Sequence, residues 1–93
     1  MSTIAEPLAL DGEFTIHHAA ALKERLQAAL AEGVRCLDLG GVAECDSAGV
    51  QLLLACRATV RRVGHELTLA PVSEPVRDVL QRYGLLHLLG QPD

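Results

Sequence analysis

The sequence predicts an α/β fold, with a mixed, mostly parallel sheet and helices packed mainly on one of its faces. Segments with apolar residues at three- and four-residue steps, typical of helices, alternate with short apolar segments typical of strands. The length of 93 residues suits one domain, which we expect to span residues 1–93. Apolar residues form 49% of the chain but aromatic residues only 2%, so the core must be aliphatic. Such a core favours helices on a sheet over an aromatic-rich barrel.

The first third of the chain predicts a short edge hairpin and then a helix. Pro7 interrupts the opening segment, and Asp11-Gly12 is a typical turn sequence. Apolar residues at helical steps then predict a helix over residues 15–32, with Thr15 able to cap its start. Gly33 supplies a typical helix end.

The middle of the chain predicts a central strand followed by a long helix. Residues 34–39 are mostly apolar and β-rich, as expected of a strand covered on at least one face. Gly40 and Gly41 then loosen the chain. A leucine-rich helix is predicted over residues 48–63, and Gly64 ends it.

The last third predicts a strand, a short helix and a final helical turn. Residues 66–70 alternate like a strand with one covered face, and residues 85–89 form the final turn. Ser73-Glu74-Pro75 is a typical helix start. The buried stripe of that helix is predicted to contain Val76, Val79, Leu80 and Tyr83. Because helices alternate with strands, the strands after the hairpin should be parallel.

Charge and hydropathy exclude several classes of function. Eight basic and twelve acidic residues give a net charge of −4, and no segment gathers basic with aromatic residues, which argues against direct nucleic-acid binding. Apolar runs reach at most five residues, far below the roughly 20 that span a bilayer, so we expect no membrane insertion. The N-terminus lacks the basic region of a signal peptide. Basic residues at 57, 61 and 62 suit a solvated helix face, or contact with an acidic partner or a nucleotide phosphate.

The cysteines and histidines give no metal or disulfide pattern. Cys36, Cys45 and Cys56 are odd in number and widely spaced, so we expect small core residues in a reducing cytoplasm. His17 and His18 are adjacent and point to different sides of their helix, unlike a metal-binding pair, and at least one should be exposed. We therefore expect no metal and no cofactor.

Asp46 and Ser47, directly before the leucine-rich helix, allow two interpretations. Either residue can cap the helix, which would explain the pair by itself. Alternatively, Ser47 presents its hydroxyl to a partner, because Ala48 and Gly49 leave the first turn sterically open and at least one leucine nearby should be only partly covered. A phosphate on Ser47 would lie at the positive end of the helix, leaving the fold intact while disrupting an interface.

An enzymatic role for this turn has weaker support. A hydrolase nucleophile requires Gly-x-Ser-x-Gly, but Cys45 occupies the first glycine position. His65 and His87 would have to act as base, and neither has a partner nearby in sequence to orient it. The helix start could lower the pKa of Cys45, yet most such cysteines are small neighbours of the core. We expect no enzymatic activity.

Two stretches together resemble the STAS domain, the fold of bacterial anti-sigma-factor antagonists. The longer one is "LDLGGVAECDSAGVQLLLACRATVRRVGHELTLAPVSEPVRDVLQRYGL", in which a strand leads through Asp-Ser-x-Gly into a helix, and a later strand precedes another helix start. The upstream "LDGEFTIHHAAALKERL" is similar to the first strand, turn and helix of the family. The resemblance covers nearly the whole chain.

The resemblance implies a regulator that switches partners. In antagonists of this family, an anti-sigma factor that is also a serine kinase phosphorylates the serine after the aspartate, and the unphosphorylated form binds that kinase and frees the sigma factor. Asp46 matches the aspartate and Ser47 the phosphorylated serine, whereas Ala48 replaces a second Ser or Thr found in many antagonists. The expected partner-binding residues are Asp46, Ser47, Ala48, Gly49, Gln51 and Leu52.

The resemblance leaves other roles open. Some small STAS proteins resemble subunits of bacterial phospholipid-transport ABC complexes. In those complexes a hydroxyl residue at this turn lies against the ATPase. Others accompany chemotaxis operons or anion transporters. Fold does not fix function among these, so the sequence predicts a cytoplasmic docking protein whose partner is an anti-sigma factor with kinase activity or, alternatively, an ABC ATPase.

Overall fold

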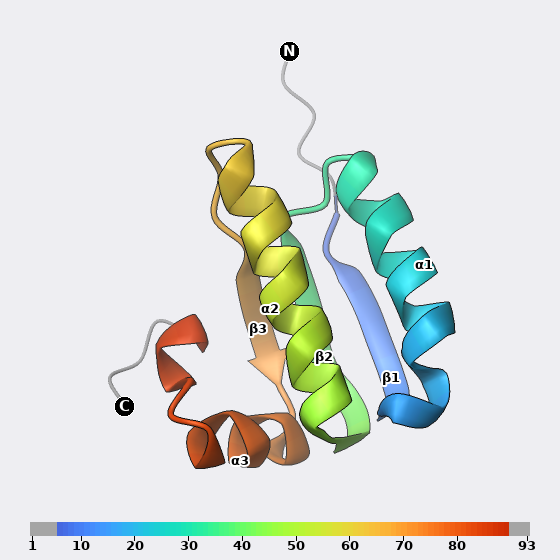
Figure 1. The fold of residues 1–93 in the computed structure, drawn as a ribbon, viewed down its shortest axis with the longest axis vertical. Coiled ribbons are helices and arrows are strands. Elements are labelled where there is room, and N and C mark those ends of the chain that lie inside the picture. Colours follow the sequence, from blue (N-terminus) through green and yellow to red (C-terminus); the bar gives the residue numbers. More distant parts are fainter. Residues whose placement is uncertain (1–5, 90–93) are drawn as a thin grey trace.

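A three-stranded parallel sheet in the order β1–β2–β3 organises the protein (Figure 1). The computed structural model describes residues 6–89. The strands are β1 (Leu8–Phe14), β2 (Cys36–Cys45) and β3 (Thr68–Val72). Both neighbouring pairs are parallel, and within residues 6–89 no antiparallel pair occurs. The predicted α/β class is therefore confirmed, with the sheet parallel throughout the described residues.

The helices pack mainly on one face of this sheet, as predicted. They are α1 (Ala19–Ala31), α2 (Ser47–Arg62) and α3 (Glu74–Arg82), with short 3-10 turns η1 (Ile16–His18) and η2 (Leu86–Leu89). Figure 1 shows α1 and α2 side by side in front of the strands, whereas α3 lies across the carboxyl end of the sheet. The strands are parallel, so their carboxyl ends lie at the same end of the sheet. That end therefore holds η1, the start of α2 and the start of α3.

The core between the sheet and the helices is aliphatic except for Phe14, which is 1% exposed. Alternate residues of the strands face the helices, and α2 and α3 bury one stripe each. The core members contributed by the strands are Leu10, Phe14, Leu37, Leu39, Val42 and Leu69. The predicted stripe of α3 is confirmed at Val76, Val79 and Leu80, but Tyr83 is wrong because the helix ends at Arg82 and leaves the ring 57% exposed.

The predicted edge hairpin is wrong within the described residues; the part of the opening segment before residue 6 lies outside them. Asp11 and Gly12 continue β1 instead of reversing it, with Gly12 at a φ of 73°. β2 is also longer than predicted, because Gly40 and Gly41 belong to it. The register between β1 and β2 shifts twice, and at each shift β2 contributes one residue more than β1. Glycines thus serve here as bulge residues of one sheet, not as turns.

The helix ends differ from the prediction in details that affect the candidate site. Thr15 precedes the 3-10 turn η1, and its hydroxyl bonds to Glu13 instead of capping a helix. Ser73 occupies the N-cap position of α3, but its side chain makes no capping hydrogen bond. Val63, the last residue of the helix predicted over residues 48–63, lies just after α2 and is 62% exposed.

Candidate docking site at the start of helix α2

Asp46, not Ser47, caps α2. The Asp46 backbone is extended, with φ −122° and ψ −171°, and its Oδ1 accepts hydrogen bonds from the amides of Ala48 at 2.9 Å and Gly49 at 3.1 Å. These are amides of the first turn, which have no acceptor within the helix. The two sequence-based possibilities for the cap are thereby resolved in favour of the aspartate.

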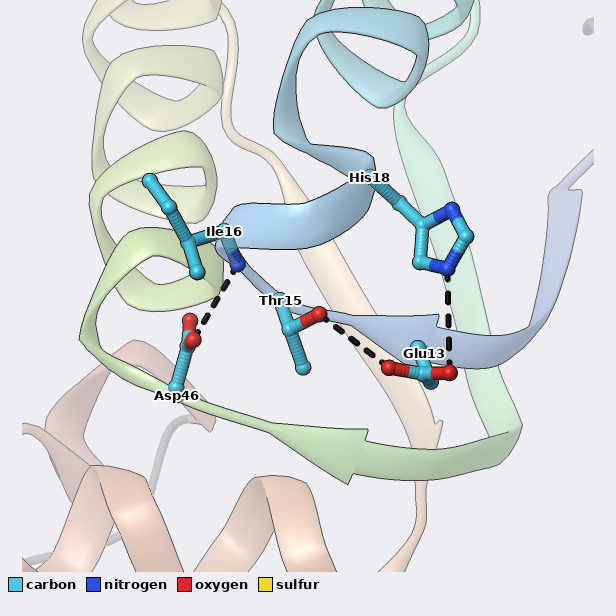
Figure 2. A network of polar contacts seen from close by, with 5 residues as sticks. All are labelled: Glu13, Thr15, Ile16, His18 and Asp46. Atoms are coloured by element: carbon cyan, nitrogen blue, oxygen red, sulfur yellow. Dashed lines mark hydrogen bonds and ion pairs between the residues drawn. The ribbon is translucent and has the colours of Figure 1, made fainter.

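The same carboxylate joins α2 to the turn after β1. Asp46 Oδ2 accepts a hydrogen bond from the Ile16 amide at 3.1 Å, as Figure 2 shows. In addition, the Asp46 amide donates to the Phe14 carbonyl at 3.4 Å. The hydrogen bond from Ile16, and those from Gly49 and Ala48, stabilise the ionised form and lower the pKa of Asp46, against the opposing effect of burial. One ionised side chain thus fixes two segments that lie thirty residues apart in sequence.

Gly49 is required by the close approach of α2 to the end of β1. A Cβ atom at this position would overlap the Phe14 carbonyl oxygen and would lie 2.7 Å from Cδ2 of the Phe14 ring. It would also lie 3.0 Å from Cys45 Sγ. Because two of these contacts are shorter than real Cβ contacts, no other residue fits without moving the helix. The glycine of Asp-Ser-x-Gly therefore lets the first turn of α2 pack against backbone.

Ser47 is exposed as the first residue of α2. Within residues 6–89 its hydroxyl has no hydrogen-bond partner, because Asp46 already accepts from the amides of Ala48 and Gly49. Capping consequently does not explain the serine. The side chain is accessible at the surface, at the start of the helix.

The other predicted contact residues differ in accessibility. Gln51 is exposed and Ala48 and Leu52 are half-buried, so all three are at least partly accessible at the surface. Gly49 is buried, and its role in the structure is the close approach to β1. The prediction of incompletely covered leucines is confirmed, since both Leu52 and Leu54 are half-buried.

Ile16 is the part of this surface that sequence reasoning missed. Its side chain is 65% exposed although it is large and apolar, and Figure 2 shows it beside the first turns of α2. The network behind it consists of Thr15 Oγ1, which donates to Glu13 Oε1 at 3.4 Å, and His18 Nε2, which lies 3.7 Å from Glu13 Oε2. Helical periodicity places Ile16 inside the predicted helix of residues 15–32. The sequence signal that could have indicated its surface role is a large apolar residue directly after a strand.

Burial affects two of the three cysteine thiols, Cys45 and Cys56. Burial, followed by the Asp46 charge, raises the pKa of Cys45 to about 11, and burial raises the pKa of Cys56 to about 11. Both thiols therefore stay protonated at neutral pH. His17 and His18 are both exposed, and among the described residues no cluster of His, Cys, Asp and Glu could hold a metal ion.

The parallel sheet, the helices on one face and the aspartate-capped helix after the central strand define a STAS-type domain. Residues 2–90 match the family described as "Mlab, STAS domain", and the chain belongs to that family. The fold is also similar to that in the crystal structure of a sulfate transporter family protein from Wolinella succinogenes, with a TM-score of 0.70 and 20% sequence identity. The match covers 96% of this chain and 76% of that one. No curated protein matches the sequence significantly.

Membership of the STAS family agrees with a domain that contacts other proteins. Within residues 6–89 no helix has both the length and the apolar character needed to cross a membrane.

Proposed function

We propose that this protein is an anti-sigma-factor antagonist-like regulator that docks through the start of α2 and is controlled by phosphorylation of Ser47. Its partner would be an anti-sigma factor with serine kinase activity, so that docking regulates transcription in a bacterial cytoplasm. The observation that supports this proposal best is the exposed Ser47 hydroxyl, which the cap formed by Asp46 leaves without a structural role.

The charges at this turn suit a switch that changes the surface but not the fold. A phosphate on Ser47 would bring roughly −1.5 to −2 charge next to the ionised Asp46. It could not use the Ala48 and Gly49 amides, which already donate to Asp46, so the helix would gain little from it. A partner that approaches Ile16 and Leu52 would instead meet a concentrated negative charge, and charges of one sign at an interface cost several kcal/mol.

We further propose that the protein acts without catalysing a reaction. His65 follows the far end of α2, and the sixteen-residue helix separates it from Ser47 by about 24 Å. The protonated Cys45 is a poor nucleophile for the same site. These positions argue against a serine or thiol hydrolase and in favour of a docking role.

Charge substitution at Ser47 tests the proposal. The full-length protein, immobilised, captures partners from a lysate of its own bacterium, and mass spectrometry identifies them. We expect a serine kinase, freed of its sigma factor, on the wild type and on Ser47→Ala, and no kinase on Ser47→Asp. The matched control is Gln81→Glu, which adds the same charge at an exposed position of α3 and should capture the kinase normally. If Ser47→Asp binds the kinase as tightly as wild type, the switch is refuted.

A second candidate is a subunit of a phospholipid-transport ABC complex that docks on the ATPase. The observation that favours it is the family description, which names Mlab and not an anti-sigma-factor antagonist. The same surface would then form a permanent contact, with Ser47 against the ATPase and no phosphorylation cycle. Capture of an ABC ATPase, together with unphosphorylated Ser47 in protein purified from its host, would favour this candidate over the first.

A further inference from the structure

A groove of about 710 Å³ lies between α1 and α2 and extends from Leu52, near the start of α2, to His65, beyond its end. Figure 1 shows the two helices side by side, and the residues that line the groove run from Lys23 to Ala31 on α1 and from Leu52 to Arg62 on α2. Its floor is formed by the buried side chains of Leu26, Cys56 and Val60. Leu52 closes one end, and Val63, which is 62% exposed, borders the other. The floor of the groove is thus apolar.

Basic side chains gather at the end of the groove near Val63. Arg35 follows α1, Arg62 ends α2, and His65 follows α2. Lys23 lies further along the wall, about two turns before the end of α1. No Asp or Glu is among the described residues that line the groove. Basic residues are common at helix carboxyl ends, but here they border an apolar groove, where they can also contact an anion.

The two guanidinium groups are held in place and keep donors to spare. Arg35 Nη1 donates to the carbonyls of Val34 at 2.9 Å and Leu30 at 3.4 Å. Arg62 Nη2 donates to Thr59 Oγ1 at 3.3 Å. Each guanidinium has N–H groups on three nitrogen atoms, and these bonds engage one nitrogen of each. The remaining N–H groups can donate hydrogen bonds to a carboxylate with little loss of side-chain freedom.

The helix ends at this site oppose an anion but do not outweigh the arginines. The carboxyl ends of α1 and α2 each carry about half a negative charge. Arg35 and Arg62 together carry two positive charges, and Arg35 already donates to a carbonyl of the last turn of α1. The site therefore remains cationic, and Lys23 adds to it.

We propose that this groove binds a single-chain fatty-acid carboxylate, with the chain along the apolar floor and the carboxylate at Arg35 and Arg62. The separation of charge and apolar surface along the groove matches a ligand with one anionic end. The volume lies within the range of roughly 300–1,000 Å³ typical of small-molecule sites. The stretch from Leu52 to Val63 is about 17 Å long, which suits an extended chain. A partner helix would need complementary charge along its face, and here the charge lies mostly at one end.

Titration with dodecanoate, below the concentration at which it forms micelles, tests the proposal on the full chain. We expect saturable binding by calorimetry and amide chemical-shift changes at Gln27 and Thr59, with Ser47 unaffected. Dodecyltrimethylammonium and dodecanol have the same chain without the negative charge and should bind at least about tenfold more weakly. Equal binding of the cationic amphiphile, or no binding of dodecanoate, overturns the proposal.

Matched variants locate the binding site. Arg62→Gln should weaken dodecanoate binding about tenfold, which is the usual effect of losing a charge-assisted hydrogen bond. Arg61→Gln removes the same charge from the neighbouring residue, which pairs with Glu66 outside the groove, and should bind normally. Ala55→Phe fills the groove from an exposed position and should abolish binding. If Arg61→Gln and Arg62→Gln weaken binding equally, the attraction is nonspecific and the site is wrong.

Discussion

The free energies of unfolding of Asp46 and Ser47 variants show which of the two side chains stabilises the start of α2. Asp46→Ala removes the acceptor for three backbone amides, those of Ala48, Gly49 and Ile16. Asp46→Asn keeps one carbonyl oxygen for the cap but has no second acceptor for Ile16. Ser47→Ala removes a hydroxyl that has no hydrogen-bond partner within residues 6–89.

The expected losses follow from these bonds. An N-cap residue contributes about 1 kcal/mol, and the hydrogen bond from Ile16, at 3.1 Å, adds about 1 kcal/mol. We therefore expect Asp46→Ala to lower the free energy of unfolding by about 2 kcal/mol and Asp46→Asn by about 1 kcal/mol. Ser47→Ala should stay within about 0.5 kcal/mol of wild type, as exposed substitutions usually do. If Ser47 capped the helix, Ser47→Ala would instead lower the free energy of unfolding by about 1 kcal/mol.

Urea unfolding followed by far-UV circular dichroism measures these differences. With a slope of about 1.5–2 kcal/mol per M, Asp46→Ala should lower the midpoint by roughly 1 M. Ser47→Ala should leave the midpoint nearly unchanged. A loss for Ser47→Ala equal to that of Asp46→Ala would mean that the serine caps the helix, and the case for a free hydroxyl would fail.

Three further predictions follow from the same site. Gly49→Ala should destabilise the domain by at least about 2 kcal/mol in the same urea assay, because its Cβ would overlap the Phe14 carbonyl; a neutral effect would contradict the close approach. The pKa of Asp46 is lowered, so its contribution to stability is present above about pH 4, the ordinary range of an aspartate, and is lost as the pH falls through the folded-state value. The difference between wild type and Asp46→Asn should accordingly shrink in urea titrations below about pH 4, and a difference independent of pH would refute the charged cap. Cys45 and Cys56, with pKa values raised to about 11, should resist iodoacetamide at pH 7 in the native protein and react after unfolding, as intact-mass analysis would show; rapid native reaction would contradict their burial.

The sequence predicts the fold well where periodicity is unambiguous. The stripe of Val76, Val79 and Leu80 is determined by helical spacing, and the structure buries it as expected. The prediction fails at glycines, because Gly40 and Gly41 look like a loop in sequence but lie at a bulge in β2. Only the neighbouring strands determine which role such residues take.

The candidate site is predictable in part for a similar reason. Asp46 and Ser47 are adjacent in sequence, so local rules suffice to place both at the start of a helix. Ile16 comes from thirty residues earlier and reaches the site through a tertiary hydrogen bond. No local pattern contains that contact. The sequence also does not determine which of Asp46 and Ser47 caps α2, because both residue types are good caps.

The hydrogen bond between the Ile16 amide and Asp46 makes the surface around Ser47 a discontinuous epitope. A synthetic peptide with the sequence of α2 would carry the serine but not the isoleucine, nor the strand end against which Gly49 packs. Such a peptide should be a poor mimic of the protein in any competition experiment. An inhibitor or antibody directed at this surface would have to be selected against the folded domain.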